Sequence, residues 1–117
     1  MKKIHRLKKN AEFQRIYRKG SYIATKTLVA YIKPNNLKET RIGITVSKKY
    51  GKSVKRNRIR RLISESFRLL KDKVKPGYDI VFVARKTDTY EDAGLSSVMA
   101  VMSYMLDKLN VLEKEPK

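Results

Sequence analysis

The chain's net positive charge lies entirely in its first 61 residues. This part has 20 Lys or Arg against Glu12 and Glu39, whereas residues 62–117 carry nine basic and nine acidic residues. The charge is densest over residues 48–61, KKYGKSVKRNRIRR, which contain eight basic residues and no acidic one. Such a charge distribution repels itself unless a polyanion neutralises it. Any fold of this chain must therefore display the run on its surface, and the expected ligand is a phosphate backbone.

Composition narrows the class of protein further. At 117 residues the chain is expected to form a single domain spanning residues 1–117, and 41% hydrophobic residues suffice for a modest core. The absence of cysteine excludes zinc ribbons, disulfide scaffolds and thiol nucleophiles. No apolar stretch approaches the roughly 20 residues of a membrane span, so we expect a cytoplasmic protein. A basic helix on a membrane surface is disfavoured, because the charge is interleaved with strand-like segments.

The first half of the sequence predicts one helix and three strands. Residues 1–9 are expected to be a basic, mobile arm, followed by a helix with Asn10 as its N-cap and Gly20 as its stop signal. Apolar segments at residues 22–24 and 28–33 predict strands, and a turn follows at residues 34–36. Residues 41–47, RIGITVS, alternate between apolar and small or polar side chains, a pattern typical of a half-buried strand.

The second half predicts two helices around a central strand. From residue 53 to 70, apolar residues recur at helical spacing, and residues 78–84, YDIVFVA, are nearly continuously apolar, as in a strand covered on both faces. Apolar residues from Leu95 to Leu112 predict a long C-terminal helix, with a polar tail at residues 113–117. The order α-β-β-β-α-β-α predicts an α+β fold with a two-layer sandwich.

The basic run overlaps the start of the helix predicted at residues 53–70. Ile59, Ile63 and Phe67 would face the core, while most of the arginines would lie on the outer face or at the first turn. Guanidinium groups on a rigid element suit bidentate phosphate contacts. The alternative is a solvated helix face with pairs such as Arg61–Glu65. Eight basic residues without one acid among them favour a nucleic-acid surface instead.

Four segments resemble the bacterial ribonuclease P protein family. They are RLKKNAEF (residues 6–13), RIGITVSKK (41–49), KRNRIRRLI (55–63, containing the family's RNR motif) and DIVFVARK (79–86). The resemblance covers most of the chain in order. It implies a ribosomal-protein-like fold with a left-handed βαβ crossover, whereas general rules would favour a right-handed one.

The resemblance also implies two RNA-binding sites. The site for the catalytic RNA subunit would comprise Lys48, Lys49, Lys52, Lys55, Arg56, Asn57, Arg58, Arg60 and Arg61. The site for the single-stranded 5′ leader of precursor tRNA would comprise Phe13, Tyr17, Val29, Tyr31 and Lys86. Aromatic rings beside a shallow sheet face can stack on bases without reading their sequence. Without the family, ordinary packing of a helix on a sheet would be the preferred explanation for Phe13 and Tyr17.

The sequence offers no recognisable catalytic group. The single histidine, His5, lies in the expected arm without a positioned partner, and no acidic pair has a spacing suited to catalysis. We therefore expect no catalytic residue and no cofactor in the chain. The resemblance implies that the RNA subunit and its Mg²⁺ ions perform the hydrolysis, with no DNA or membrane partner. A non-catalytic ribosomal-type RNA-binding protein is the alternative, and a stand-alone nuclease is disfavoured.

Overall fold

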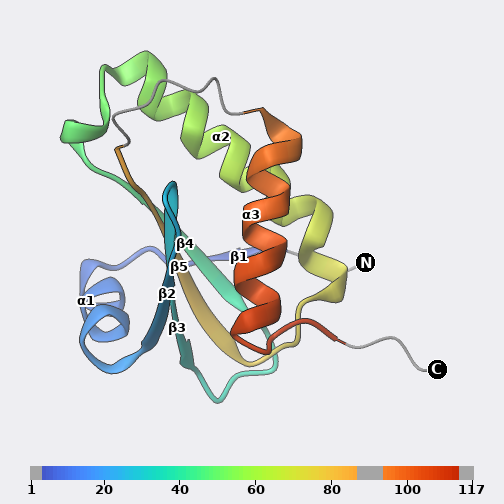
Figure 1. Ribbon diagram of the computed structural model, residues 1–117. Coiled ribbons are helices and arrows are strands. Elements are labelled where there is room, and N and C mark those ends of the chain that lie inside the picture. The colour runs from blue at the N-terminus through green and yellow to red at the C-terminus, as the bar shows by residue number, and fades with distance from the viewer. Residues whose placement is uncertain (1–3, 87–93, 114–117) are drawn as a thin grey trace.

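The computed structural model describes residues 4–86 and 94–113 (Figure 1). Its main elements are β1 (His5–Arg6), α1 (Asn10–Lys19), β2 (Ser21–Ala24), β3 (Leu28–Pro34), β4 (Arg41–Val46), α2 (Ser53–Leu70), β5 (Tyr78–Ala84) and α3 (Leu95–Lys108). Short 3-10 turns, η1 (Lys48–Tyr50) and η2 (Lys71–Lys73), flank α2. The predicted α+β class is confirmed, and the boundaries of α1, α2 and β5 match the sequence patterns.

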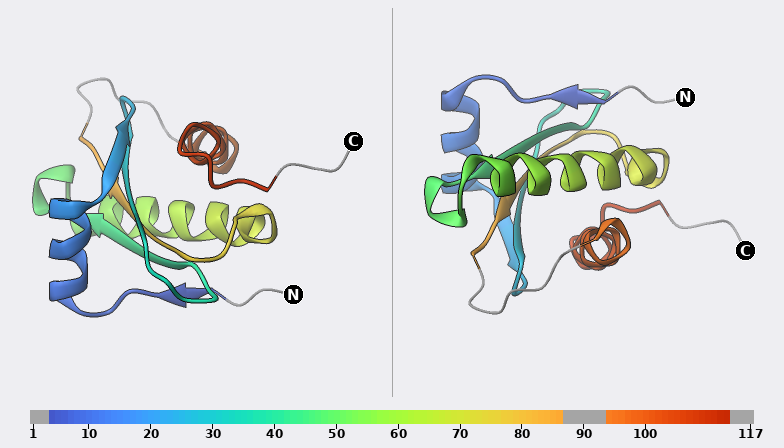
Figure 2. Two further views of the ribbon diagram at one scale, coloured as in Figure 1. Left: turned by 90° about the horizontal axis from the view of Figure 1, so that it is seen from below. Right: turned by 90° about the horizontal axis from the view of Figure 1, so that it is seen from above.

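The strands form one five-stranded sheet in the order β1-β4-β5-β3-β2. β5 is parallel to β4 and antiparallel to β3, while β2 continues the sheet as an antiparallel partner of β3. The connection from β4 through α2 to β5 is left-handed (Figures 1 and 2), as the resemblance implied, although most such connections are right-handed.

α2 and α3 cover one face of the sheet and form the main core with it (Figure 2). Ile42, Ile80 and Phe82 point into this core and are completely buried, as are Ile63 of α2 and Met102 of α3. This packing explains the apolar stripe of α2, whose inner face must be dry although its outer face is basic.

α1 packs on the opposite face and covers only part of it (Figure 1). Ile16 inserts from α1 against Val81 of β5, and both side chains are at least 99% buried. The ring of Phe13 lies directly on Gly43, where a Cβ atom would approach two ring carbons to 2.6 Å. Gly43 therefore allows α1 to approach β4 closely.

The expectation of a mobile arm at residues 1–9 is wrong for residues 4–9, while residues 1–3 lie outside the described residues. His5 and Arg6 pair with β4, Leu7 is buried and donates its N–H to the carbonyl of Ile42, and Arg6 donates to Ser64 Oγ on α2. The chain then enters α1 with Lys9, not Asn10, as the N-cap. Backbone pairing and burial of Leu7 hold this basic segment in place.

The C-terminal predictions also need correction. α3 ends at Lys108 instead of continuing to Leu112, because Asn110 adopts a positive φ of 64° that a helix cannot continue through. Val111 is buried and Leu112 bridges Val74, so the apolar pattern persists outside a helix. Glu113, placed in the polar tail, donates its N–H to the carbonyl of Lys73, while residues 114–117 lie outside the described part. Among the described residues, no helix is long and apolar enough to cross a membrane.

Gly43→Ala should destabilise the fold, because the added methyl group displaces the Phe13 ring from its seat on β4. We expect the free energy of unfolding to fall by about 1–3 kcal/mol, the usual cost of overpacking. Urea unfolding of this variant, Phe13→Leu and the double variant would measure the coupling. The double variant should lose less stability than the sum of the single changes. Strict additivity would show that the two sites do not share this contact.

Candidate nucleic-acid interface

The basic surface is built on η1 and the first half of α2. Ile59, Ile63 and Phe67 anchor the helix in the core, so the side chains around its outer face are held on a packed element. All nine residues predicted for the RNA-subunit site belong to this one region, and all except Arg56 are exposed: Lys48, Lys49, Lys52, Lys55, Asn57, Arg58, Arg60 and Arg61. We call these nine residues the basic surface.

Several features suit this end of α2 to phosphate. Its N-cap, Lys52, makes no side-chain capping bond, and its first turn contains no acidic residue. The partial positive charge of the helix N-terminus is thus reinforced by basic side chains instead of being neutralised. Arg56 is half-buried, and its buried Nε has no hydrogen-bond partner. An anion at this end would relieve repulsion among these groups.

The alternative of a solvated helix face included an ion pair between Arg61 and Glu65. Glu65, the acid considered as a partner for Arg61, accepts hydrogen bonds from Arg68 instead, with a shortest N–O distance of 2.5 Å. This contact lowers the pKa of Glu65 and raises that of Arg68. The pair lies at a later turn of α2, so it leaves the charge of the basic surface uncompensated by Glu65.

The second candidate surface is the part of the sheet that α1 leaves uncovered. The register aligns Gly43, Val81, Tyr31 and Tyr22 in one row across four strands, and Thr45, Val83, Val29 and Ala24 in the next row. Val29 and Val83 remain half-buried because α1 does not extend over them. We call the half-buried or exposed residues Phe13, Tyr17, Val29, Tyr31, Val83 and Tyr22 the aromatic face.

Tyr17 fixes the geometry of this face. Its hydroxyl lies 2.8 Å from Thr45 Oγ1 on β4, and its ring meets Tyr31 of β3 edge-on at a centroid distance of 5.0 Å. The ring of Tyr22 lies on the other strand next to Tyr31, with centroids 5.6 Å apart and planes inclined by 35°. The three rings thus form a continuous row leading from α1 to the sheet edge.

The structure brings together four of the five residues predicted for the leader site. Phe13 also packs on Gly43, so it contributes to the packing of α1 on the sheet, the alternative role considered from the sequence. Lys86 is exposed two residues beyond β5, where Arg85 bonds to the backbone of Thr25 and Thr27 in the β2–β3 turn. Sequence reasoning missed Tyr22. Tyr22 lies opposite Tyr31 because β2 and β3 form a short hairpin. The closeness of the two predicted strands in the sequence could have identified this pair.

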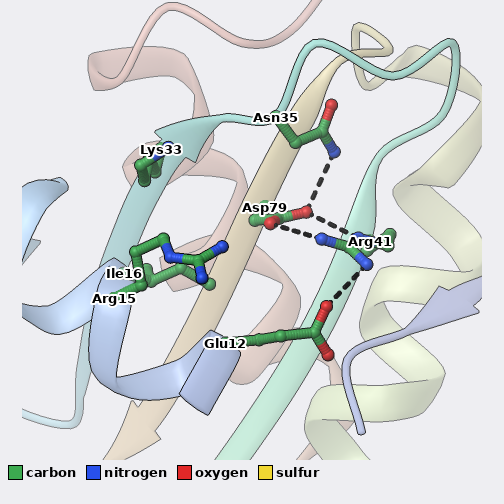
Figure 3. Close-up of a pocket in the computed structure, with 7 residues that line it drawn as sticks. All are labelled: Glu12, Arg15, Ile16, Lys33, Asn35, Arg41 and Asp79. Carbon is green, nitrogen blue, oxygen red and sulfur yellow. Dashed lines mark hydrogen bonds and ion pairs between the residues drawn. The ribbon is translucent and has the colours of Figure 1, made fainter. Parts of the chain in front are cut away.

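A partly buried ion-pair network, which sequence reasoning also missed, links α1 to the sheet (Figure 3). Arg41 of β4 donates Nε and Nη2 to the two carboxylate oxygens of Asp79 at 2.9 and 2.8 Å, and Nη1 to Glu12 of α1 at 2.8 Å. Asn35 donates to Asp79 as well. The hydrogen bond to Asp79 is the main cause that raises the pKa of Arg41. The backbone N–H of Lys9 does most to lower the pKa of Glu12, with Arg41 contributing.

The sequence-based view that His5 has no positioned partner is wrong. His5 lies on β1, the edge strand next to β4, and its Nε2 is 2.9 Å from Glu39 Oε2. Over residues 4–86 and 94–113, no group of three or more His, Cys, Asp or Glu could hold a metal ion. The described geometry offers two candidate surfaces, a basic helix end and a half-open row of rings.

Comparison with known proteins decides the family. The family model described as Ribonuclease P matches residues 1–110. The chain belongs to the ribonuclease P protein family. The ribonuclease P protein component of Alkaliphilus oremlandii is 46% identical over 112 residues, which cover 96% of each chain. That of Clostridium kluyveri is 54% identical over 85 residues, covering 71% of this chain and 76% of the relative.

Solved structures agree with the fold. The ribonuclease P protein of Staphylococcus aureus, 37% identical, superposes with a TM-score of 0.81 over 95% of this chain and all of that one. The protein from Thermotoga maritima, 28% identical, gives a TM-score of 0.80 over 89% and 96% of the two chains. Membership of the ribonuclease P family implies a subunit of a tRNA-processing ribonucleoprotein endonuclease that partners with the ribonuclease P RNA.

Glu12→Gln should weaken the attachment of α1 in a pH-dependent manner. The pKa of Glu12 is lowered in the folded state, so its stabilisation is complete above the ordinary value of 4.5 and is lost as pH falls through the folded pKa. At pH 7 we expect the variant to lose about 1 kcal/mol of unfolding free energy. Urea unfolding from pH 7 to 3 should show the difference shrinking below 4.5. Glu65→Gln is the control: it removes an exposed ion pair with Arg68, so the free energy of unfolding should fall by less than in Glu12→Gln. A pH-independent difference would exclude the charge as its cause.

Proposed function

We propose that the chain is the RNA-binding subunit of ribonuclease P and that it promotes removal of the 5′ leader from precursor tRNA. In this proposal, the basic surface binds the catalytic RNA and the aromatic face binds the leader. The main observation in its support is the presence of both surfaces on one small scaffold. A basic helix packs on one face of the sheet, and a half-open row of rings lies on the other face.

The basic surface suits a structured RNA. Its arginines and lysines project from a helix whose opposite side is buried, so they can contact successive phosphates without further ordering of the backbone. Such contacts position an RNA without reading its sequence. They would also reduce repulsion between the catalytic RNA and its polyanionic substrate.

The aromatic face suits a single strand. Unpaired bases can stack on exposed rings with about 1–3 kcal/mol per base and little sequence preference. The half-buried Val29 and Val83 offer an apolar floor beside Tyr17 and Tyr31. Lys86, exposed at the end of β5, would add a phosphate contact. A base-paired segment could not present its base faces to these rings.

We assign the hydrolysis to the RNA subunit, whose bound Mg²⁺ would supply the metal chemistry, and we expect the complex to act in the cytoplasm without DNA or membrane partners. A ribosomal-type RNA-binding protein remains the alternative function. It would account for the basic surface but gives no reason for a row of half-exposed rings. A stand-alone nuclease would need a cluster of catalytic or metal-holding side chains. In the part of the chain that the structure describes, no group of three or more His, Cys, Asp or Glu could hold a metal ion.

Cleavage of precursor tRNA at low Mg²⁺ tests the proposal directly. The catalytic RNA alone, the protein alone and the two together are compared, and the 5′ ends of the products are mapped. We expect little cleavage by the RNA alone, none by the protein alone, and efficient formation of the mature 5′ end by both together. Cleavage by the protein alone, or no improvement over the RNA alone, would contradict the proposal.

Arg58→Ala should weaken assembly with the catalytic RNA and lower its dependence on salt. Loss of one phosphate contact reduces the slope of log K against log salt concentration by about 1. Binding titrations at several salt concentrations would measure this slope. Lys73→Ala is the matched control, since it removes one exposed charge roughly 20 Å farther along the helix axis, beyond the screening length. An equal change in slope for both variants would mean that only net charge matters.

A further inference from the structure

Tyr22 is the most exposed ring of the aromatic face, with 65% of its surface accessible. It lies on β2, the edge strand of the sheet, and directly opposite Tyr31 in the β2–β3 pairing. Exposure of a large ring on an edge strand has a cost, because apolar surface stays in water. The ring contributes little to the main core, which lies on the opposite face.

We propose that Tyr22 extends the leader-binding site by one stacking position, so that a leader base rests on the Tyr22–Tyr31 pair at the sheet edge. This inference rests on the proposed function of the aromatic face and makes Tyr22 a determinant of the leader length that the protein recognises. The occupant is a nucleobase of single-stranded RNA.

The row of rings supports this assignment. Tyr17 meets Tyr31 edge-on from one side, and Tyr22 flanks Tyr31 with planes inclined by 35° from the other. Strands lie about 4.8 Å apart, so the row from Gly43 on β4 to Tyr22 on β2 spans roughly 14 Å. Sheets that bind single-stranded RNA stack two or three bases over similar rows of aromatic residues. Tyr22 supplies the outermost ring of such a row.

The charge around Tyr22 favours RNA over a protein partner. Arg18 and Lys19 end α1 directly before β2, and Lys26 follows in the β2–β3 turn, all three exposed. The only acidic residues in the first 61 are Glu12, which pairs with Arg41, and Glu39, which contacts His5 beyond β4 at the opposite edge of the sheet from β2. A polyanion approaching β2 therefore meets these three cations, while both acidic residues of this part of the chain lie away from β2.

A leader-length series tests the inference in the reconstituted holoenzyme. Binding of precursor tRNAs whose leaders grow by one nucleotide is measured for Tyr22→Ala, Tyr22→Phe, Tyr31→Ala and the unchanged protein. We expect Tyr22→Ala to weaken binding by about five-fold, but only above a threshold leader length at which the strand reaches β2. Tyr22→Phe should retain affinity, because it keeps the ring. Tyr104→Ala, which removes another exposed tyrosine on α3, is the matched control.

A spectroscopic measurement separates stacking from a general loss of stability. The chain contains no tryptophan, so Tyr22→Trp introduces a single fluorescent probe, and Tyr104→Trp provides the same probe elsewhere. Quenching of the Tyr22→Trp signal by leader-bearing precursor, but not by mature tRNA, is expected. The Tyr104→Trp signal should not distinguish the two RNAs.

The outcomes distinguish this inference from the proposed function. If Tyr31→Ala weakens leader binding while Tyr22→Ala does not at any leader length, the extension to Tyr22 is wrong and the leader site stands. If neither variant discriminates precursor from mature tRNA, the leader site itself is wrong. Quenching of Tyr22→Trp by the catalytic RNA alone would place Tyr22 on the other RNA and overturn the inference.

Discussion

Burial of β5 on both faces is the constraint on which the rest of this structure depends. Ile80 and Phe82 point toward α2 and α3, whereas Val81 points toward α1, and all three are completely buried. A strand of this kind requires helices on both sides. β5 lies between β4 and β3 in the sheet. Packing against its two faces holds α2 on one side and α1 on the other. The two candidate RNA surfaces are therefore supported by the same strand, and neither has to provide its own core.

α1 is held at one end of its face, and this placement leaves the aromatic face open. The Arg41 network fixes the start of the helix through Glu12, while Gly43 accepts the Phe13 ring two residues farther along β4. α1 crosses the strands: its first turn lies beside Arg41 of β4, and Gly20 at its end lies against Ile32 of β3, in the adjacent row of the sheet. Val29 and Val83 thus remain only half-buried beyond Tyr17. The opening follows from the direction of α1 across the sheet and from its attachment near one end of the strands.

Local patterns predicted the elements of this fold well, because the signals of period two, period 3.6 and continuous burial are local. They failed where a segment is held by distant partners. The two-residue strand β1 has no pattern of its own and depends on β4, and the Arg41 network joins residues 12, 41 and 79. Apolar spacing through Leu112 could not reveal that Asn110 turns the chain out of α3. The composition of the basic surface was readable from sequence, whereas the place of Tyr22 in the row of rings required the register of the hairpin.

The two surfaces differ in the interaction that would bind an RNA: phosphate contacts on the basic surface and base stacking on the aromatic face. This difference would direct two different RNAs to two different surfaces. Phosphate contacts are available to any nucleic acid and weaken as salt rises, so the basic surface alone would not distinguish a catalytic RNA from its substrate. Stacking requires an unpaired base with a free face, which a folded RNA offers mainly in loops and a leader offers along its length. The rings would thereby select a single strand without reading its sequence. The scaffold already carries a large net positive charge, so additional cations would strengthen binding to any RNA. Apolar and aromatic contacts would instead give the aromatic face a preference for a single strand.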